Sequence, residues 1–250
     1  VRRAAAYPHT LNDYGAQYLY GIPKKDQSLD EVESLLLEQV EQIKQGAFED
    51  WILPAIVTDF KKKRKSQLES NSGRVRLMRA AFLEFEDWTH ATDAISRMEL
   101  LTKNDIVRVA KRYFDEGYVA GYRIDEKPEI PKIEKPSIEK IEIDGTRQSE
   151  FALTVQAMPH DEIEPIFVDP EKDFTIFDYH DGVKLFYSQN PVSDLFSLNI
   201  SIDFGTHQDN KIGVATRLLD KAGTKTYAPE ALKKEWYKLG TDFGISAGDN

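Results

Sequence analysis

The chain has 250 residues, of which 40% are hydrophobic, 30% charged and 11% aromatic. This composition is typical of a globular protein and excludes collagen-like, low-complexity and wholly disordered classes. The 33 Lys and Arg residues against 43 Asp and Glu residues give a formal net charge of -10. That charge disfavours nucleic acid as the main partner, because binding to phosphates needs an excess of cations.

The residue types that are missing exclude further classes. A chain without cysteine has no disulfide, no cysteine-ligated zinc or iron–sulfur site and no thiol nucleophile. No apolar run approaches the ~20 residues that cross a bilayer, so we expect no membrane span. The sequence begins at Val1, without Met and without an apolar signal core, and this predicts an internal segment of a longer protein.

The first part of the chain carries clear helix signals. Residues 15–23 have the pattern of a strand, and a capping box formed by Ser28 and Glu31 predicts the start of a helix. Apolar residues recur at helical spacing over residues 29–43, and Gly46 supplies a terminator.

Residues 49–114 continue the helical period. The pattern lapses at residues 70–73 and again at residues 88–92, so we expect three helices. The last of them begins at Thr102, where Asp105 completes a pattern that resembles a capping box.

A strand and then a linker are expected next. Residues 118–124 alternate in the manner of a strand. Residues 127–144 interleave Pro128, Pro131 and Pro136 with charged residues, and no regular element can include all three prolines. This pattern predicts an extended and fairly stiff linker.

The remainder of the chain mixes strands and helices. Strands are expected at residues 174–177, 183–187 and 195–204, and the Asp181-Gly182 turn between the first two predicts a hairpin. Two helices follow, at residues 211–221 and at residues 229–239, the latter ending at Gly240. We therefore expect an α/β (α+β) chain with mixed or largely antiparallel sheets backed by helices.

No catalytic or metal-binding motif is found in the sequence. None of the histidines forms the His-Glu-x-x-His pattern or its inverse; they are His9, His90, His160, His180 and His207. The run His160-Asp161-Glu162 is at most a weak chelator. Gly-x-Ser-x-Gly occurs once, at residues 244–248, but a helix precedes it where a nucleophile elbow requires a strand.

The strongest basic cluster is the run Lys61-Lys62-Lys63-Arg64-Lys65. Five successive cations spread around the circumference of a helix, so a solvated surface is the default interpretation. A module that binds nucleic acid or anionic lipid through this run is an alternative, which the acidic balance of the chain opposes.

Two stretches resemble the insulinase-type zinc peptidases, also called pitrilysins. Residues 204–224 are similar to the opening of a domain of that family, with a strand, a Gly, an acidic residue, the Gly213-Val214-Ala215 word on a helix and a Gly223-Thr224 pair. In the family's catalytic domain the inverse zinc motif follows Gly-x-Ala directly. Here residues 216–220 read Thr, Arg, Leu, Leu and Asp, so both imidazoles and the base are missing, and Asp220 is one ligand at most.

The second stretch, residues 15–124, resembles the later part of the domain that follows the catalytic one. Its words are Ser28-Leu29-Asp30-Glu31-Val32-Glu33, Lys44-Gln45-Gly46-Ala47-Phe48-Glu49, Leu101-Thr102-Lys103-Asn104-Asp105-Ile106 and Val109-Ala110-Lys111-Arg112-Tyr113-Phe114. The resemblance implies repeated metallopeptidase-like domains in two halves around a peptide-degrading chamber. Residues 1–125 would be the rear of a non-catalytic domain, residues 126–172 the linker, and residues 173–250 the front of a second, degenerate domain.

The function that this resemblance implies is indirect. The chain would help to enclose and bind a peptide or protein substrate, while zinc in the catalytic half of the parent chain performs proteolysis, so we expect no catalytic, cofactor-binding or metal-binding residue here. The resemblance favours a periplasmic or other extracytoplasmic location. The alternative is a non-enzymatic scaffold or assembly subunit of the same fold. A zinc motif upstream in the reading frame distinguishes the two.

Overall fold

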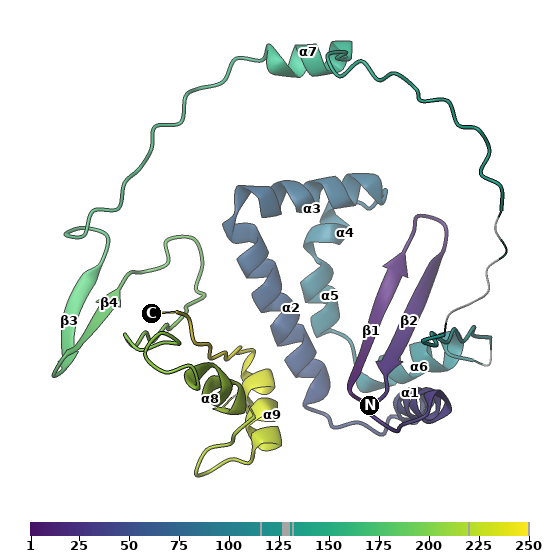
Figure 1. Cartoon of the computed structure of the whole chain (residues 1–250), viewed down its shortest axis with the longest axis horizontal. Helices are drawn as coiled ribbons and strands as arrows, with labels where there is room; N and C mark the ends of the chain where they lie inside the picture. Colours follow the sequence, from purple (N-terminus) through teal and green to yellow (C-terminus); the bar gives the residue numbers. More distant parts are fainter. Residues whose placement is uncertain (116, 127–130, 132, 220, 250) are drawn as a thin grey trace. The chain divides into compact units, whose positions relative to one another are not determined.

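The computed structural model describes residues 1–115, 117–126, 131, 133–219 and 221–249. It falls into two compact units, one made of Val1–Tyr122 with Asn190–Asn250 and the other of Arg123–Gln189. Within the described residues the elements are, in chain order (Figure 1), β1 (Arg3–Thr10), β2 (Gly15–Ile22), α1 (Leu29–Lys44), α2 (Ile52–Glu69), α3 (Asn71–Leu83), α4 (Trp88–Thr92), α5 (Ala94–Glu99), α6 (Lys103–Tyr113), α7 (Glu150–Gln156), β3 (Thr175–His180), β4 (Val183–Tyr187), α8 (Ile212–Leu219) and α9 (Pro229–Leu239). Both sheets are antiparallel pairs, so the expected α+β class is confirmed.

Helices α1 and α6 begin as the sequence predicts. The Ser28 hydroxyl accepts a hydrogen bond from the Glu31 amide at 3.1 Å, and the Glu31 carboxylate accepts one from the Ser28 amide at 2.9 Å. Thr102 and Asp105 exchange the same pair of bonds at the start of α6. The two helices pack together, and Val32 and Val40 of α1 and Ala110 of α6 are buried.

The hairpin β1–β2 contacts α1 through the end of β2, where residues 19–22 are partly buried. In the antiparallel register Ala4 lies opposite Gly21, and Ala6 lies opposite Leu19. A Cβ atom at Gly21 would lie 2.4 Å from Cγ1 of Val32, which shows how closely the strand approaches the helix. Strand β1 was not expected, because a run of alanines favours helix over strand. Its strand conformation comes from pairing with β2, which the sequence of β1 alone does not indicate.

The segment 49–114 forms five helices where three were expected. The break at Ser70 is confirmed, since its hydroxyl caps α3 by accepting from the Gly73 amide at 3.0 Å. The lapse at residues 88–92 is itself the short helix α4, whose start is capped by the Asp87 carboxylate. The apolar pattern lapses there because a helix of five residues buries only Ala91.

The elements near the end of the chain agree with the expected boundaries. Gly182 takes a φ of 75° in the β3–β4 turn, which is the conformation that this turn requires. Helix α8 covers eight residues of the expected 211–221, and α9 begins at Pro229 and ends at Gly240, whose φ is 64°.

Two expected strands are not formed. Residues 118–124 have no ladder partner; instead the Tyr118 and Tyr122 hydroxyls both donate to the Glu33 carboxylate on α1. The hydrogen bond to Glu33 raises the pKa of Tyr122 to about 12. Residues 195–204 keep their alternation but do not form a strand, and the Ile200 side chain is 81% exposed. A strand pattern yields a strand only where another backbone offers hydrogen bonds.

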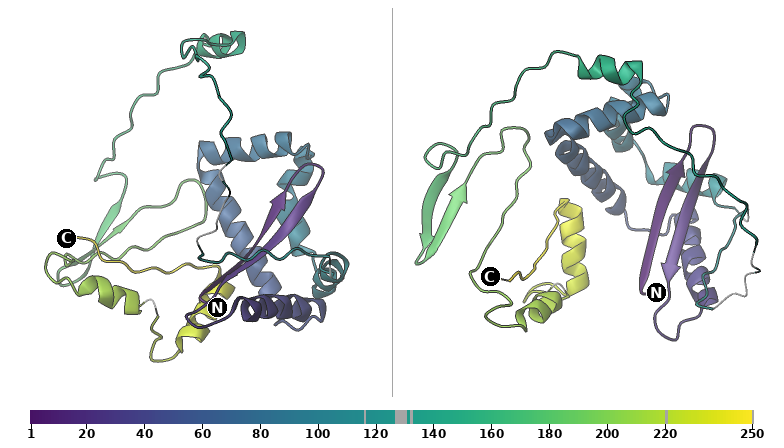
Figure 2. Two further views of the ribbon diagram at one scale, coloured as in Figure 1. Left: turned by 45° about the vertical axis from the view of Figure 1, so that its right-hand side comes forward. Right: turned by 45° about the horizontal axis from the view of Figure 1, so that its top comes forward.

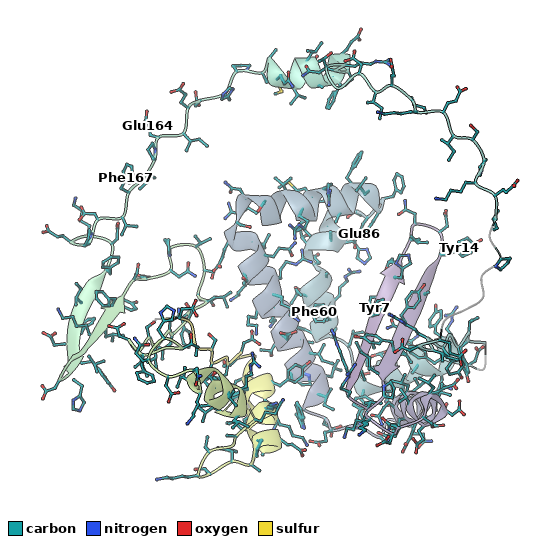
Figure 3. The ribbon with its side chains drawn as sticks, in the orientation of Figure 1. Tyr7, Tyr14, Phe60, Glu86, Glu164 and Phe167 are labelled. Atoms are coloured by element: carbon teal, nitrogen blue, oxygen red, sulfur yellow. The ribbon has the colours of Figure 1, made fainter. Side chains whose placement is uncertain are left out.

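The unit Arg123–Gln189 holds the hairpin β3–β4, helix α7 and irregular chain. Helix α7 falls inside the stretch 126–172 assigned to the linker, with Ser149 as its cap. The described part of residues 127–144 has no regular structure, whereas Pro128 lies outside the described residues. The side chains of Glu164 and Phe167 project from an extended stretch of this unit (Figure 3).

Much apolar surface lacks cover. Many large apolar side chains are exposed, among them Phe82 at 78%, Phe85 at 85% and Phe196 at 92%. Among the residues that the structure describes, the buried apolar side chains are small ones, namely Val32, Val40, Ala55, Val57, Ala81, Ala91 and Ala110. Among the described residues, none of the helices combines the length and the apolar character needed to cross a membrane.

The close approach at Gly21 gives a test of the hairpin packing. We expect Gly21→Ala to lower the free energy of unfolding by about 1–3 kcal/mol, because the new methyl group meets the stiff, buried Val32. The matched control is Gly121→Ala, where the added atom meets nothing within 4 Å and the change should stay within about 0.5 kcal/mol. Urea unfolding measures both, and equal effects would contradict the packing.

Candidate functional site

The most extensive polar contact of the first unit lies along one side of α2. Thr58, Lys62, Lys65 and Glu69 are spaced by four, three and four residues, which places them on one face of the helix. We call these four residues the α2 stripe. Each contacts the part of the same unit formed by residues 190–242. Figure 2 shows α2 meeting α3 at an elbow. The stripe ends at Glu69, which is the last residue of α2.

Glu69 holds a turn that is wound around Asn190. The Glu69 carboxylate accepts hydrogen bonds from the Ser193 hydroxyl at 2.6 Å and from the Asn190 side-chain amide at 2.9 Å. The Asn190 amide group also donates to the Leu195 carbonyl, and its oxygen accepts from the Val192 amide at 3.0 Å. Asn followed by Pro favours such a turn, because proline restricts the residue before it to extended conformations.

Two lysines of the stripe form ion pairs with aspartates remote in the sequence. Lys65 lies 2.6 Å from an Asp194 oxygen, and Lys62 lies 2.7 Å from an Asp242 oxygen. The aspartate side chains are 74% and 90% exposed, so water and salt screen both ion pairs strongly.

Helix α9 adds an aromatic contact at the other end of α2. The Trp51 ring meets the Tyr237 ring edge-on at 6.2 Å, and the Lys238 ammonium lies 5.3 Å from the centre of the Trp51 ring. A Cβ atom at Gly240 would lie 2.7 Å from Cγ2 of Thr58, so the left-handed glycine that ends α9 also lets it approach the stripe.

An open cleft of about 650 Å³ lies between the α2–α3 elbow and the Asn190 turn. Most residues that line it are polar, and Leu195 and Phe196 add apolar surface; the polar ones include Lys62, Glu69, Arg76, Asn190 and Asp242. The elbow itself depends on Gly73, which is buried and whose Cβ would lie 1.8 Å from the Gln67 carbonyl oxygen.

Glu69 is a carboxylate at the edge of the cleft whose hydrogen-bond partners are given by the structure. The hydrogen bonds from Ser193 and Asn190 lower the pKa of Glu69. A carboxylate with a lowered pKa is a weaker base than an ordinary glutamate. The arrangement is suited to binding and docking through charge.

The histidines are dispersed over the structure. His9 packs edge-on against Tyr18 of the hairpin, and His90 lies 3.4 Å from Glu86 at an α4 turn. His160 and His207 are exposed, and the His180 ring accepts from the Asp181 amide. No group of three or more metal-ligating side chains occurs among the residues that the structure describes, and this includes the stretch 160–162.

The position of the family's zinc motif falls on α8. Thr216 is buried there, and its hydroxyl donates to the Gly213 carbonyl at 3.2 Å. Asp220, the one potential ligand that the sequence offers at this place, lies outside the described residues. Residues 244–248 form an irregular segment, in which the Gly248 carbonyl accepts from the Thr206 amide.

The basic run 61–65 is largely paired with carboxylates. Besides Lys62 and Lys65, Lys63 lies 2.6 Å from Asp59 and Lys61 pairs with Glu99. The sequence reveals the run, but its partners at 194 and 242 lie more than a hundred residues away and no local pattern predicts them. The sequence also contains a signal that extends the run, because the arginines of α3 follow it within fifteen residues.

Comparison with known proteins does not assign the chain to a family. It matches no protein-family model, no curated protein and no solved structure.

The carboxylates of this contact predict how stability depends on pH. Hydrogen bonds and lysines lower the pKa values of Glu49, Glu69, Asp194 and Asp242, with Trp51, Ser193, Lys65 and Lys62 as the respective largest causes. A carboxyl group with a lowered pKa stabilises the folded state fully above its unfolded pKa of about 4, and the stabilisation is lost as the pH falls through the folded pKa.

We therefore expect the urea midpoint to decline as the pH falls below about 4.5, with no contribution from these groups between pH 7 and 5. Glu69→Gln should lower the midpoint at pH 7 and make the acid decline shallower, because the amide cannot titrate. Glu38→Gln on the exposed side of α1 is the control and should leave the decline unchanged. A decline of the same depth in Glu69→Gln would contradict the assignment.

Proposed function

We propose that this chain is a non-catalytic segment of an insulinase-type zinc metalloendopeptidase, which helps to enclose and bind peptide substrate. The observation that carries the proposal is that short sequence motifs resembling those of the family follow one another in the family's order and spacing over most of the chain. The secondary structure supports it, because the motif at residues 28–33 lies at the start of α1, the motif at residues 101–106 lies at the start of α6, and Gly213-Val214-Ala215 lies on α8.

The residues of α8 do not fit a zinc ion. Thr216, Arg217, Leu218 and Leu219 stand where the family's motif begins, and none of them offers an imidazole or a carboxylate. No catalytic step is therefore assigned to this chain. Water activation by zinc would be supplied by the catalytic half of the parent chain, and residues 173–250 would form the front of its degenerate counterpart.

The uncovered surface supports a role that depends on other polypeptide. Residues 118–124 and 195–204 have strand patterns without partners, and strands of that kind are completed by a neighbouring backbone. A chamber wall built from several domains supplies such neighbours. The same feature favours the second candidate, a scaffold or assembly subunit of the same fold in which both halves have lost zinc. A His-x-x-Glu-His motif in the reading frame upstream favours the peptidase.

The isolated chain should bind no zinc and cleave no peptide. We expect less than about 0.1 equivalent of zinc after dialysis, measured by elemental analysis, because one carboxylate does not hold the ion. We also expect no turnover of a quenched fluorescent peptide. Stoichiometric zinc retained by the isolated chain, or peptide cleavage without the catalytic half, would overturn the proposal.

Cover of the unpaired segments is tested by hydrogen exchange. The amides of residues 198–203 should exchange freely in the isolated chain and become protected by at least about a hundredfold in the full-length protein, since strand pairing buries them. The capped helix α1 is the internal control, because it is formed in both samples. Equal exchange of residues 198–203 in the two samples would show that no neighbouring strand is added.

A further inference from the structure

The elbow between α2 and α3 concentrates positive charge in an acidic chain. Residues 61–79 contain eight cations and a single carboxylate, Glu69, while the whole chain has a net charge of -10. We call this set the basic elbow; its cations are Lys61, Lys62, Lys63, Arg64, Lys65, Arg74, Arg76 and Arg79. A patch of one sign on a surface of the other sign attracts ligands of complementary charge.

The cations of the basic elbow are only partly neutralised. Lys61, Lys62, Lys63 and Lys65 each pair with a carboxylate. Within the described part of the chain, Arg64, Arg76 and Arg79 form no ion pair. Arg76 and Arg79 are exposed on α3, and Arg76 also lines the open cleft.

The carboxylates that the elbow already holds indicate the class of ligand. Asp194 and Asp242 are acidic side chains of polypeptide, and both meet lysines of the α2 stripe from an extended or irregular backbone. The Asn190 side chain and the Ser193 hydroxyl add neutral hydrogen bonds next to them. These are contacts by which an acidic peptide segment is recognised.

We propose that the basic elbow is a binding surface for acidic polypeptide segments, and that Asp194 and Asp242 of the chain itself occupy part of it. The aspartates act as an internal competitor at Lys62 and Lys65, whereas Arg76 and Arg79 stay open to a partner. Occupation by the chain's own residues lowers the apparent affinity for an external segment, because only the undocked fraction offers all the cations.

The test measures binding of a fluorescein-labelled glutamate dodecapeptide to the full chain by anisotropy at low salt. Asp194→Asn combined with Asp242→Asn keeps the shape of both side chains and removes their charge. We expect this double variant to bind about threefold to tenfold more tightly, because Lys62 and Lys65 no longer pair with the chain's own carboxylates and exposed ion pairs are individually weak. Binding of either protein should weaken steeply as salt rises.

Charge reversal supplies the opposite change. Arg76→Glu combined with Arg79→Glu should abolish binding, whereas Lys24→Glu combined with Lys25→Glu, outside the elbow, should have a much smaller effect. Helicity by circular dichroism checks that each variant is folded. The proposal is overturned if the Asn double variant binds no better than the wild type, or if both charge reversals weaken binding equally.

Two further probes separate the ligand classes. Heparin and vesicles of anionic phospholipid carry sulfate and phosphate groups, without the carboxylates of a polypeptide. Weaker binding of both than of the glutamate peptide, at equal charge, supports the proposal. Tighter binding of either would assign the basic elbow to polyanions or to a membrane surface and overturn the acidic-polypeptide assignment.

Discussion

The first unit of this protein depends on the α2 stripe. These four residues contact residues that follow them by more than 120 positions in the sequence. In the sequence, the separate unit Arg123–Gln189 is inserted between the two parts. The contact combines weak, exposed ion pairs with the neutral hydrogen bonds at Glu69 and with the approach of Gly240. An interface of this kind is specific in position but modest in free energy.

That balance explains how the basic run is used. A run of five cations would stand as a solvated surface if its partners lay only on the same helix. Here one face of α2 is aligned with carboxylates from a remote segment, another meets Asp59 of the same helix, and a third meets Glu99 of α5. The lysines of α2 are therefore paired in three directions within the unit, and further cations follow on α3.

Local structure was largely predictable from the sequence, because its causes are local. The capping box at Ser28, the Gly182 turn and the Pro229 start of α9 are fixed by residues within a few positions of each other. Residues 195–204 were predicted wrongly as a strand, because a strand needs a partner backbone that no local pattern supplies. The candidate site was foreseen only as a basic run, since Asp194 and Asp242 are brought to it by the fold.

The unpaired segment 198–204 has a consequence for the isolated chain. An extended backbone with Leu198, Ile200, Ile202 and Phe204 on one side is a template for aggregation by intermolecular β-pairing, and Asp203 is its one charged residue. At neutral pH the mutual repulsion of chains with a net charge of -10 opposes that pairing. Near the isoelectric point of about 5.1 this repulsion vanishes. The isolated chain is therefore kept from aggregating by its net charge, whereas in a protein with a covered strand edge the cover itself would prevent aggregation.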